Sequence, residues 1–126
     1  MTNVLADTSV WVGHFRAPNA ALAERLAMGG VLMHPMVLGE VACGTPPERA
    51  RTLRDMARLQ MARQASMNEV LVLIDQENLH GLGCGLVDMY LLASTLVTPG
   101  AELWTLDKRL LALARRFGIA HQPQLH

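Results

Sequence analysis

The chain has 126 residues and is 51% hydrophobic, which suits one folded domain over residues 1–126. Its 11 basic and 11 acidic side chains cancel, so composition alone does not indicate a strongly charged partner such as a nucleic acid. No apolar stretch approaches the roughly 18 residues of a membrane span and no secretion signal is evident, so we expect a cytoplasmic protein without membrane association. Cys43 and Cys84 stand among small apolar residues and are expected to be reduced thiols in the core.

The first half of the chain alternates short apolar runs with helical patterns. Residues 3–6 predict a buried strand that ends at Asp7 in a polar loop, 20–27 predict a helix, and 31–35 a second short strand. A helix is expected at about 36–43. Thr-Pro-Pro-Glu at 45–48 then has the pattern of a capping box with prolines in the first turn, and predicts a long helix to about residue 63.

The second half repeats this alternation. Ser-Met-Asn-Glu at 66–69 is another capping box and predicts a helix that ends near residue 81, and residues 86–97 form a further apolar helix. Residues 102–107 predict a strand, 107–118 a helix, and 119–123 a last edge strand. Because strands alternate with helices and no hairpin turns join them, we predict an α/β fold of three layers, with a central parallel sheet of about four short strands flanked by helices.

Two acids follow predicted strands. Asp7 comes directly after the first strand, and Asp107 directly after the third. Ligands bind beyond the carboxyl ends of parallel strands, so both side chains are expected at one edge of the sheet. The alternative explanation is ordinary for either residue, because an Asp between a strand and a helix often caps the helix N-terminus.

Two further acids lie on helix faces that are otherwise apolar. The residues three and four positions from Glu40 are Met36, Val37, Cys43 and Gly44. Those that follow Asp88 at the same spacing are Leu91 and Leu92. An unpaired charge on a buried face is costly. The alternatives are a salt bridge to an arginine for Glu40 and a favourable helix dipole for Asp88.

Convergence of these four acids explains them together, and we call them the acidic quartet: Asp7, Glu40, Asp88 and Asp107. Two carboxylates about 4 Å apart repel by roughly 4 kcal/mol at an effective dielectric constant of about 20, so such a cluster needs a cation. Oxygen ligands alone favour Mg²⁺ or Mn²⁺, whereas the five histidines lack the paired spacing of a zinc site. We therefore predict that all four acids are metal ligands and catalytic residues, in a site suited to in-line hydrolysis of a phosphodiester.

Three hydroxyl side chains stand beside these acids in the sequence: Thr8, Ser9 and Thr105. They are candidates for a supporting role in which they orient carboxylates or water. Their alternative role is to cap helices or to satisfy the backbone of loops.

Four segments, in this order and spacing, resemble the PIN-domain nucleases, and most of all VapC, the toxin of bacterial VapBC toxin–antitoxin pairs: NVLADTSVWV, MVLGEVACG, GLVDMYLLAST and LWTLDKRLLALARRFGI. The resemblance places the family's acids on the acidic quartet, with Asp7 and Asp88 as the most direct metal ligands. It implies a PIN-like fold, Mg²⁺- or Mn²⁺-dependent endoribonuclease activity, a homodimer, and inhibition by a small VapB-like antitoxin.

Three alternatives remain at this point. The first is a PIN-like binding or regulatory module without catalysis. The second is a PIN nuclease of RNA processing without an antitoxin, and the third is a phosphotransfer enzyme with Asp7 as the nucleophile. The intact acidic quartet argues against the first. The third would require a second Asp two positions after Asp7, where this chain has Ser9. The sequence does not indicate which RNA is cut.

Overall fold

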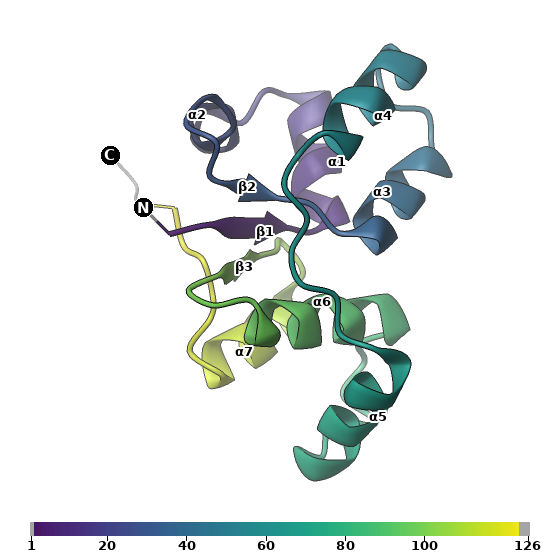
Figure 1. Cartoon of the computed structure of the whole chain (residues 1–126), viewed down its shortest axis with the longest axis vertical. Helices are drawn as coiled ribbons and strands as arrows, with labels where there is room; N and C mark the ends of the chain where they lie inside the picture. The colour runs from purple at the N-terminus through teal and green to yellow at the C-terminus, as the bar shows by residue number, and fades with distance from the viewer. Residues whose placement is uncertain (1, 124–126) are drawn as a thin grey trace.

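A parallel sheet of three strands lies at the centre of the computed structural model, which describes residues 2–123 (Figure 1). Its strands are β1 (Val4–Ala6), β2 (Val31–Leu32) and β3 (Glu102–Trp104), hydrogen-bonded in the order β2-β1-β3. Both pairs of neighbours are parallel. The carboxyl ends of all three strands therefore lie at one edge of the sheet, as predicted.

The expected edge strand at 119–123 is reduced to one bridge. Leu103 pairs in parallel with Ala120, and its N–H donates to the carbonyl of Ile119 at 2.7 Å. The N–H of His121 donates back to the Leu103 carbonyl at 2.8 Å. The segment occupies the fourth position of the sheet beside β3, but only one residue pairs, so the sheet has three strands and a bridge rather than four strands.

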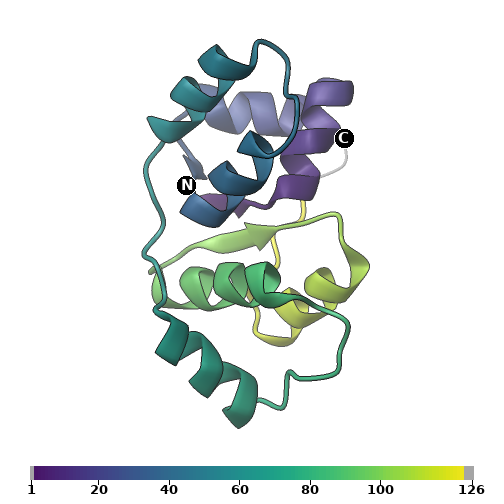
Figure 2. The ribbon, with the colours of Figure 1, turned by 90° about the vertical axis from the view of Figure 1, so that its right-hand side faces the viewer.

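The described residues contain seven helices. The ribbon separates α1–α4 from α5–α7, with the strands between the two groups (Figures 1 and 2). This confirms the predicted three-layer α/β arrangement. The helix bounds are α1 Thr8–Arg16, α2 Ala20–Ala27, α3 Pro35–Ala42, α4 Arg49–Ala57, α5 Met67–Gln76, α6 Leu86–Val97 and α7 Lys108–Arg116.

Helix α1 begins where the sequence predicted a polar loop. Asp7 is its N-cap, and the side chain of Asp7 accepts a hydrogen bond from the Val10 N–H at 3.2 Å. The N–H groups of a first helical turn have no partner within the helix, and this carboxylate satisfies one of them. The Asp-Thr-Ser sequence thus starts a helix directly at the end of β1.

Helix α4 is shorter than predicted, and the expected capping box at Thr45 is wrong. The helix begins at Arg49 after Glu48, which has a left-handed backbone (φ 45°) and makes no side-chain cap. It ends at Ala57 because residues 60–62 pair with Met33 beside β2 instead. The Met33 N–H donates to the Gln60 carbonyl, and a parallel bridge forms there. The local sequence favours a longer helix, but the pairing with Met33 ends the helix earlier.

The capping box that starts α5 is confirmed. The Ser66 hydroxyl accepts from the Glu69 N–H at 3.1 Å, and the Glu69 carboxylate accepts from the Ser66 N–H at 2.9 Å. The helix ends at Gln76, earlier than the predicted residue 81. Asn78 follows with a φ of 53°, in the left-handed region where helices commonly stop.

The core surrounds the strands, and every residue of β1 is buried. Its largest fully buried side chains come from all three layers and include Leu5, Leu22, Leu32, Leu91, Leu92 and Leu103. The prediction of core thiols is wrong, because Cys43 is exposed and Cys84 only partly buried; both are free. None of the helices within residues 2–123 is long and apolar enough to cross a membrane.

Candidate active site

Asp7 and Asp107 lie at the carboxyl edge of the sheet. Asp7 directly follows β1, and its N–H donates to the Trp104 carbonyl at the end of β3 at 2.9 Å. Asp107 stands three residues beyond β3 and is exposed. Its carboxylate caps α7 by accepting from the Leu110 N–H at 2.9 Å. Both residues are therefore helix caps, and both lie at the predicted edge.

The Asp7 carboxylate is buried, with only 5% of the residue exposed, and hydrogen bonds reach both of its oxygens. Oδ1 accepts from the Ser9 hydroxyl at 2.5 Å and from the Val10 N–H. Oδ2 accepts from the Thr105 hydroxyl. Burial raises the pKa of Asp7 above its ordinary value, and these hydrogen bonds oppose the rise without cancelling it. Its charge is thus held in place at a cost in solvation.

The same two hydroxyls connect Asp7 to the loop between β3 and α7. The Ser9 oxygen accepts from the Leu106 N–H, and the Thr105 oxygen accepts from the Asp107 N–H, each at 3.0 Å. A buried polar group fixed in this way has a defined orientation. Ser9 and Thr105, singled out from the sequence, therefore link Asp7 to the segment that carries Asp107.

Glu40 lies on α3 and is exposed, so the inference that it points into the core is wrong. Of the neighbours on its helix face, Val37 is buried but Met36 and Cys43 are exposed. The hydroxyl of Thr8, in the first turn of α1, donates to Glu40 Oε1 at 2.6 Å. This contact places the Glu40 carboxylate beside Thr8 at the start of α1. Thr8 directly follows Asp7 in the chain.

The Asp88 carboxyl lies within electrostatic range of the other three quartet acids. It lies in the first turn of α6, and its Oδ2 accepts from the Gly85 N–H at 3.3 Å. Burial raises the pKa of the Asp88 carboxyl, and the Gly85 hydrogen bond opposes that rise. The negative charges of three other acids raise it further: Asp107, Asp7 and Glu40. All four predicted acids therefore lie within electrostatic reach of one another.

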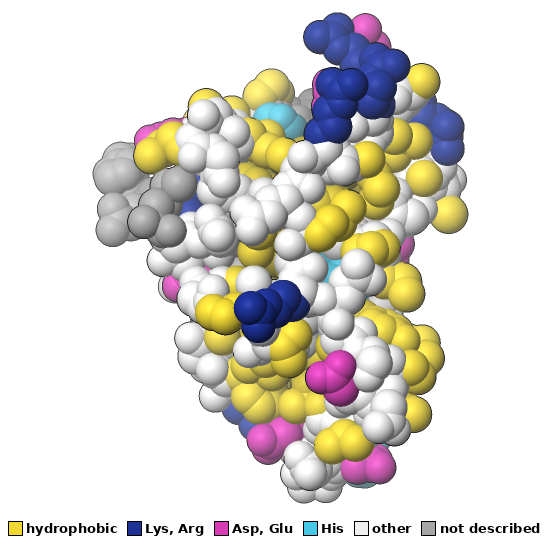
Figure 3. Space-filling view, viewed as in Figure 1, with side chains coloured by type: hydrophobic (Ala, Val, Ile, Leu, Met, Phe, Trp, Pro, Cys, Tyr) yellow, Lys and Arg dark blue, Asp and Glu magenta, His cyan; other side chains and the backbone are white. Residues whose placement is uncertain are grey.

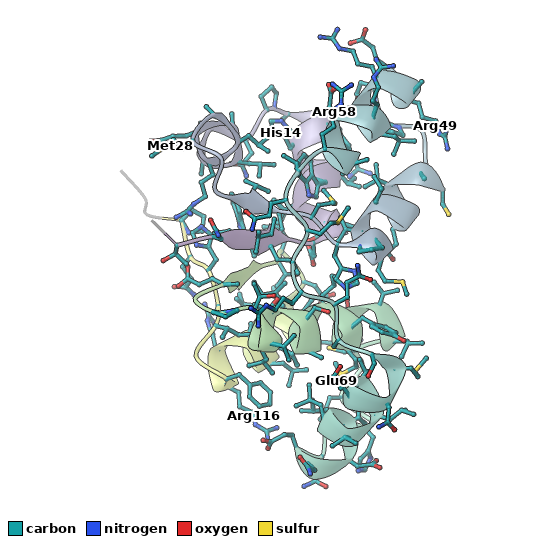
Figure 4. All side chains as sticks on the ribbon, viewed as in Figure 1. His14, Met28, Arg49, Arg58, Glu69 and Arg116 are labelled. Atoms are coloured by element: carbon teal, nitrogen blue, oxygen red, sulfur yellow. The ribbon has the colours of Figure 1, made fainter. Side chains whose placement is uncertain are left out.

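The ion pairs among the described residues do not include the quartet. Within residues 2–123 no Lys, Arg or His forms an ion pair with a quartet acid; the pairs formed are Arg51 with Glu48 and Asp55, Arg116 with Glu77, and His121 with Glu102. A basic cluster covers α4 (Figure 3). Figure 4 shows Arg49 and Arg58 at the end of the molecule that α4 forms. The negative charge of the quartet is thus not balanced by a protein cation.

The donor atoms fit a hard divalent cation that keeps part of its water. Among the described residues, no three His, Cys, Asp or Glu side chains meet closely enough to enclose a metal ion. Mg²⁺ is commonly held by only one or two carboxylates and keeps several waters, and the quartet offers carboxylate oxygens at an open edge.

Cavity size does not locate this site. A cavity of about 1110 Å³ in the described part of the chain runs along α2 and the segment that ends at Pro123. A smaller apolar groove of about 360 Å³ lies between α1, α2 and α4. Neither is lined by a quartet acid. The concentration of carboxylates marks the candidate site, and the hollows do not.

Two residues at the rim of the quartet were missed by sequence reasoning. Cys84 lies close enough that Asp88 and Asp107 add to the burial that raises its thiol pKa, and Arg109 opposes this rise. Arg109 follows Asp107 by two positions in the first turn of α7, so its place near that acid could have been recognised from the sequence. Cys84 lies in the glycine-rich turn at 81–85, but no local pattern connected Arg109 with that turn.

Comparison with known proteins identifies close relatives. The chain is 41% identical over 117 residues to Ribonuclease VapC32 from two strains of Mycobacterium tuberculosis, covering 93% of this chain and 94% of the relative. No family model matches the chain. The structure of VapBC-1 from nontypeable Haemophilus influenzae superposes with a TM-score of 0.68 and 13% identity, covering 94% of this chain and 96% of that one. At that identity the likeness shows a shared fold.

Proposed function

The chain belongs to the VapC family of PIN-domain ribonuclease toxins, and we propose that it hydrolyses RNA with Mg²⁺ or Mn²⁺ held by the acidic quartet. The observation that carries the proposal is the buried Asp7 carboxylate at the carboxyl edge of the sheet, whose two oxygens accept hydrogen bonds from Ser9 and Thr105. Four carboxylates that no protein cation neutralises would repel an RNA phosphate. A divalent cation at this edge removes that obstacle. We expect the enzyme to act in the cytoplasm, where RNA is available.

The residues have distinct roles in this proposal. Asp7 and Asp88 hold the cation most directly, and Glu40 and Asp107 complete the negative site. Ser9 and Thr105 keep the Asp7 carboxylate in one orientation. Thr8 does the same for Glu40. When bound, the cation neutralises phosphate charge and makes an attacking water more acidic.

Cleavage of purified RNA tests the proposal. We expect cleavage with Mg²⁺ or Mn²⁺ and none in excess EDTA. Asp7→Asn should abolish cleavage while circular dichroism shows a retained fold. Asp75→Asn is the matched control, because Asp75 is an exposed acid on α5 outside the quartet. Undiminished cleavage in EDTA would overturn the metal mechanism, and no cleavage with either ion would favour a PIN-like binding module.

We further propose that a VapB-like antitoxin binds this chain. The apolar groove between α1, α2 and α4 supports a protein partner, because Trp11, Phe15 and Leu59 line an open hollow of about 360 Å³ there. Trp11→Phe should weaken antitoxin binding and spare RNA cleavage. Equal antitoxin affinity in the two proteins would exclude this groove.

We also propose a homodimer. Exposed apolar side chains favour a second copy as the partner, among them Met67 and Leu71, which share one face of α5 and are 45% and 50% exposed. Figure 3 shows hydrophobic side chains on the surface near α5 and α6. Light scattering of the purified protein should give twice the chain mass. Leu71→Glu should yield a monomer, and a monomeric wild-type protein would contradict the proposal.

A further inference from the structure

Arg109 is held against the backbone of the glycine-rich turn. It lies on the first turn of α7 and is exposed, and its Nη1 is 3.5 Å from the Gly83 carbonyl oxygen. A Cβ on Gly83 would lie only 2.8 Å from Arg109 Cδ and Nη1. Gly83 also has a φ of +85°, which L side chains rarely adopt. The turn therefore provides a flat platform for the guanidinium that a side chain at this position would remove.

The charge of Arg109 acts at the rim of the acidic quartet. It opposes the rise in the Cys84 thiol pKa that burial and the charges of Asp88 and Asp107 produce. Arg109 and these two acids thus lie within electrostatic range of the same thiol. Arginines beside carboxylates usually form short, often bidentate pairs, yet no such pair joins Arg109 to a quartet acid within residues 2–123.

An arginine so placed has a consequence for substrate binding. The guanidinium contacts Gly83 and forms no ion pair with a quartet acid within residues 2–123. The guanidinium has five N–H donors, and a single weak contact to one carbonyl uses few of them. The remaining donors belong to an exposed side chain beside a site that is otherwise negative.

We infer that Arg109 binds a backbone phosphate of single-stranded RNA next to the phosphate that is cleaved, with Gly83 as its platform. The inference rests on the proposed function, since it names the substrate contact of that same site. A phosphate contact of this kind orients the strand over the carboxylates and carries no base preference. Arg109 is then a binding residue that affects the Michaelis constant and leaves the chemical step unchanged.

Arg109→Gln and Lys108→Gln test the inference, because the two neighbouring residues carry the same charge. Fluorescence anisotropy with a labelled single-stranded RNA, on an Asp7→Asn background with Mg²⁺ so that the strand is not cleaved, should show about tenfold weaker binding for Arg109→Gln. The slope of log affinity against log salt should fall by about 0.7, the value for one phosphate contact on a single strand. In the wild-type background with metal, KM should rise while kcat stays the same. Lys108→Gln should change none of these quantities.

Gly83→Ala provides a second variant that displaces the guanidinium and keeps its charge. It should weaken RNA binding in the same direction, with folding verified by circular dichroism. Equal binding by the Arg109→Gln and Lys108→Gln proteins would overturn the inference, as would a loss of kcat with unchanged KM. The binding assay does not depend on cleavage. Failure of the wild-type protein to cleave RNA would therefore refute the proposed function separately.

Discussion

Asp7 and His34 occupy equivalent places in the fold and have opposite consequences. Each follows a strand of the parallel sheet, Asp7 after β1 and His34 after β2, and each caps the next helix through its side chain. Each is buried, with 5% and 2% of the residue exposed. Hydrogen bonds reach both carboxylate oxygens of Asp7 and both ring nitrogens of His34.

His34 is a neutral structural joint, by which we mean an uncharged side chain that connects several elements through hydrogen bonds. Its Nδ1 accepts from the Met36 N–H at 3.0 Å, so the hydrogen of the neutral ring lies on Nε2 and donates to the Ser94 hydroxyl at 3.0 Å. The same hydroxyl accepts from the Ala65 N–H at 3.1 Å. Burial lowers the pKa of His34, which keeps the ring neutral. The network therefore connects β2, α3 and α6 without leaving a charge unbalanced.

Asp7 differs because hydrogen bonds do not remove its charge. Burial raises the pKa of Asp7, and the neighbouring Asp88 responds to the charges of Asp7, Glu40 and Asp107. Burial and complete hydrogen bonding are thus common to a structural joint and a candidate site. Net charge separates them, since only the carboxylates require a cation from outside the chain.

Removal of a quartet acid should have the largest effect on activity. Asp88→Asn keeps an oxygen that accepts from the Gly85 N–H but loses the negative charge. We expect kcat for RNA cleavage to fall by about 10²–10³, the cost of removing one group that stabilises developing charge. Single-turnover cleavage with Mn²⁺ measures it. A variant as active as the wild type would remove Asp88 from the site.

Disruption of the neutral joint should instead affect stability. His34→Ala leaves the Met36 N–H without its acceptor and opens a cavity, and we expect the free energy of unfolding to fall by roughly 2–4 kcal/mol. Urea denaturation measures this change. His80→Ala is the control, because His80 is exposed. If both variants were equally stable, His34 would not be a structural joint.

Sequence reasoning located the acids better than it explained them. Asp7 and Asp107 were placed correctly, because parallel strands bring their carboxyl ends to one edge. Glu40 was expected on a buried face, but helix periodicity cannot show that this face of α3 meets solvent, where Met36 and Cys43 are exposed. The shortened α4 and the single bridge at Ala120 were hidden for a related reason. Both depend on pairing between segments distant in sequence, which local propensity does not record.

Two buried threonines should distinguish the site from the core. Thr105→Val removes the hydroxyl that donates to Asp7, and we expect metal affinity or activity to fall about 10–100-fold, as for other partners of metal-binding carboxylates. Thr95→Val is the control, because that hydroxyl donates to the Leu91 carbonyl within α6. Titration with Mn²⁺ and cleavage rates measure the effect. Equal losses in both variants would assign Thr105 a merely structural role.

The smallest expected effect is on stability. Without metal, the Asp88→Asn variant should be more stable than the wild type, by an amount that depends on pH. The pKa of Asp88 is raised above its ordinary 3.8, so the unfolded chain loses this proton at a lower pH than the folded protein. Stability therefore decreases as the pH rises from 3.8 through the folded pKa, and the loss persists at neutral pH. In EDTA, Asp88→Asn should be more stable than the wild type at pH 7.5 and should lose this advantage near pH 4. The effect is modest because Asp88 is partly exposed and solvent screens its charge.

The lowered pKa of His34 destabilises both proteins below its ordinary 6.5, so it cancels in the difference. Urea unfolding at the two pH values measures that difference, and a gain independent of pH would show that the Asp88 charge carries no strain.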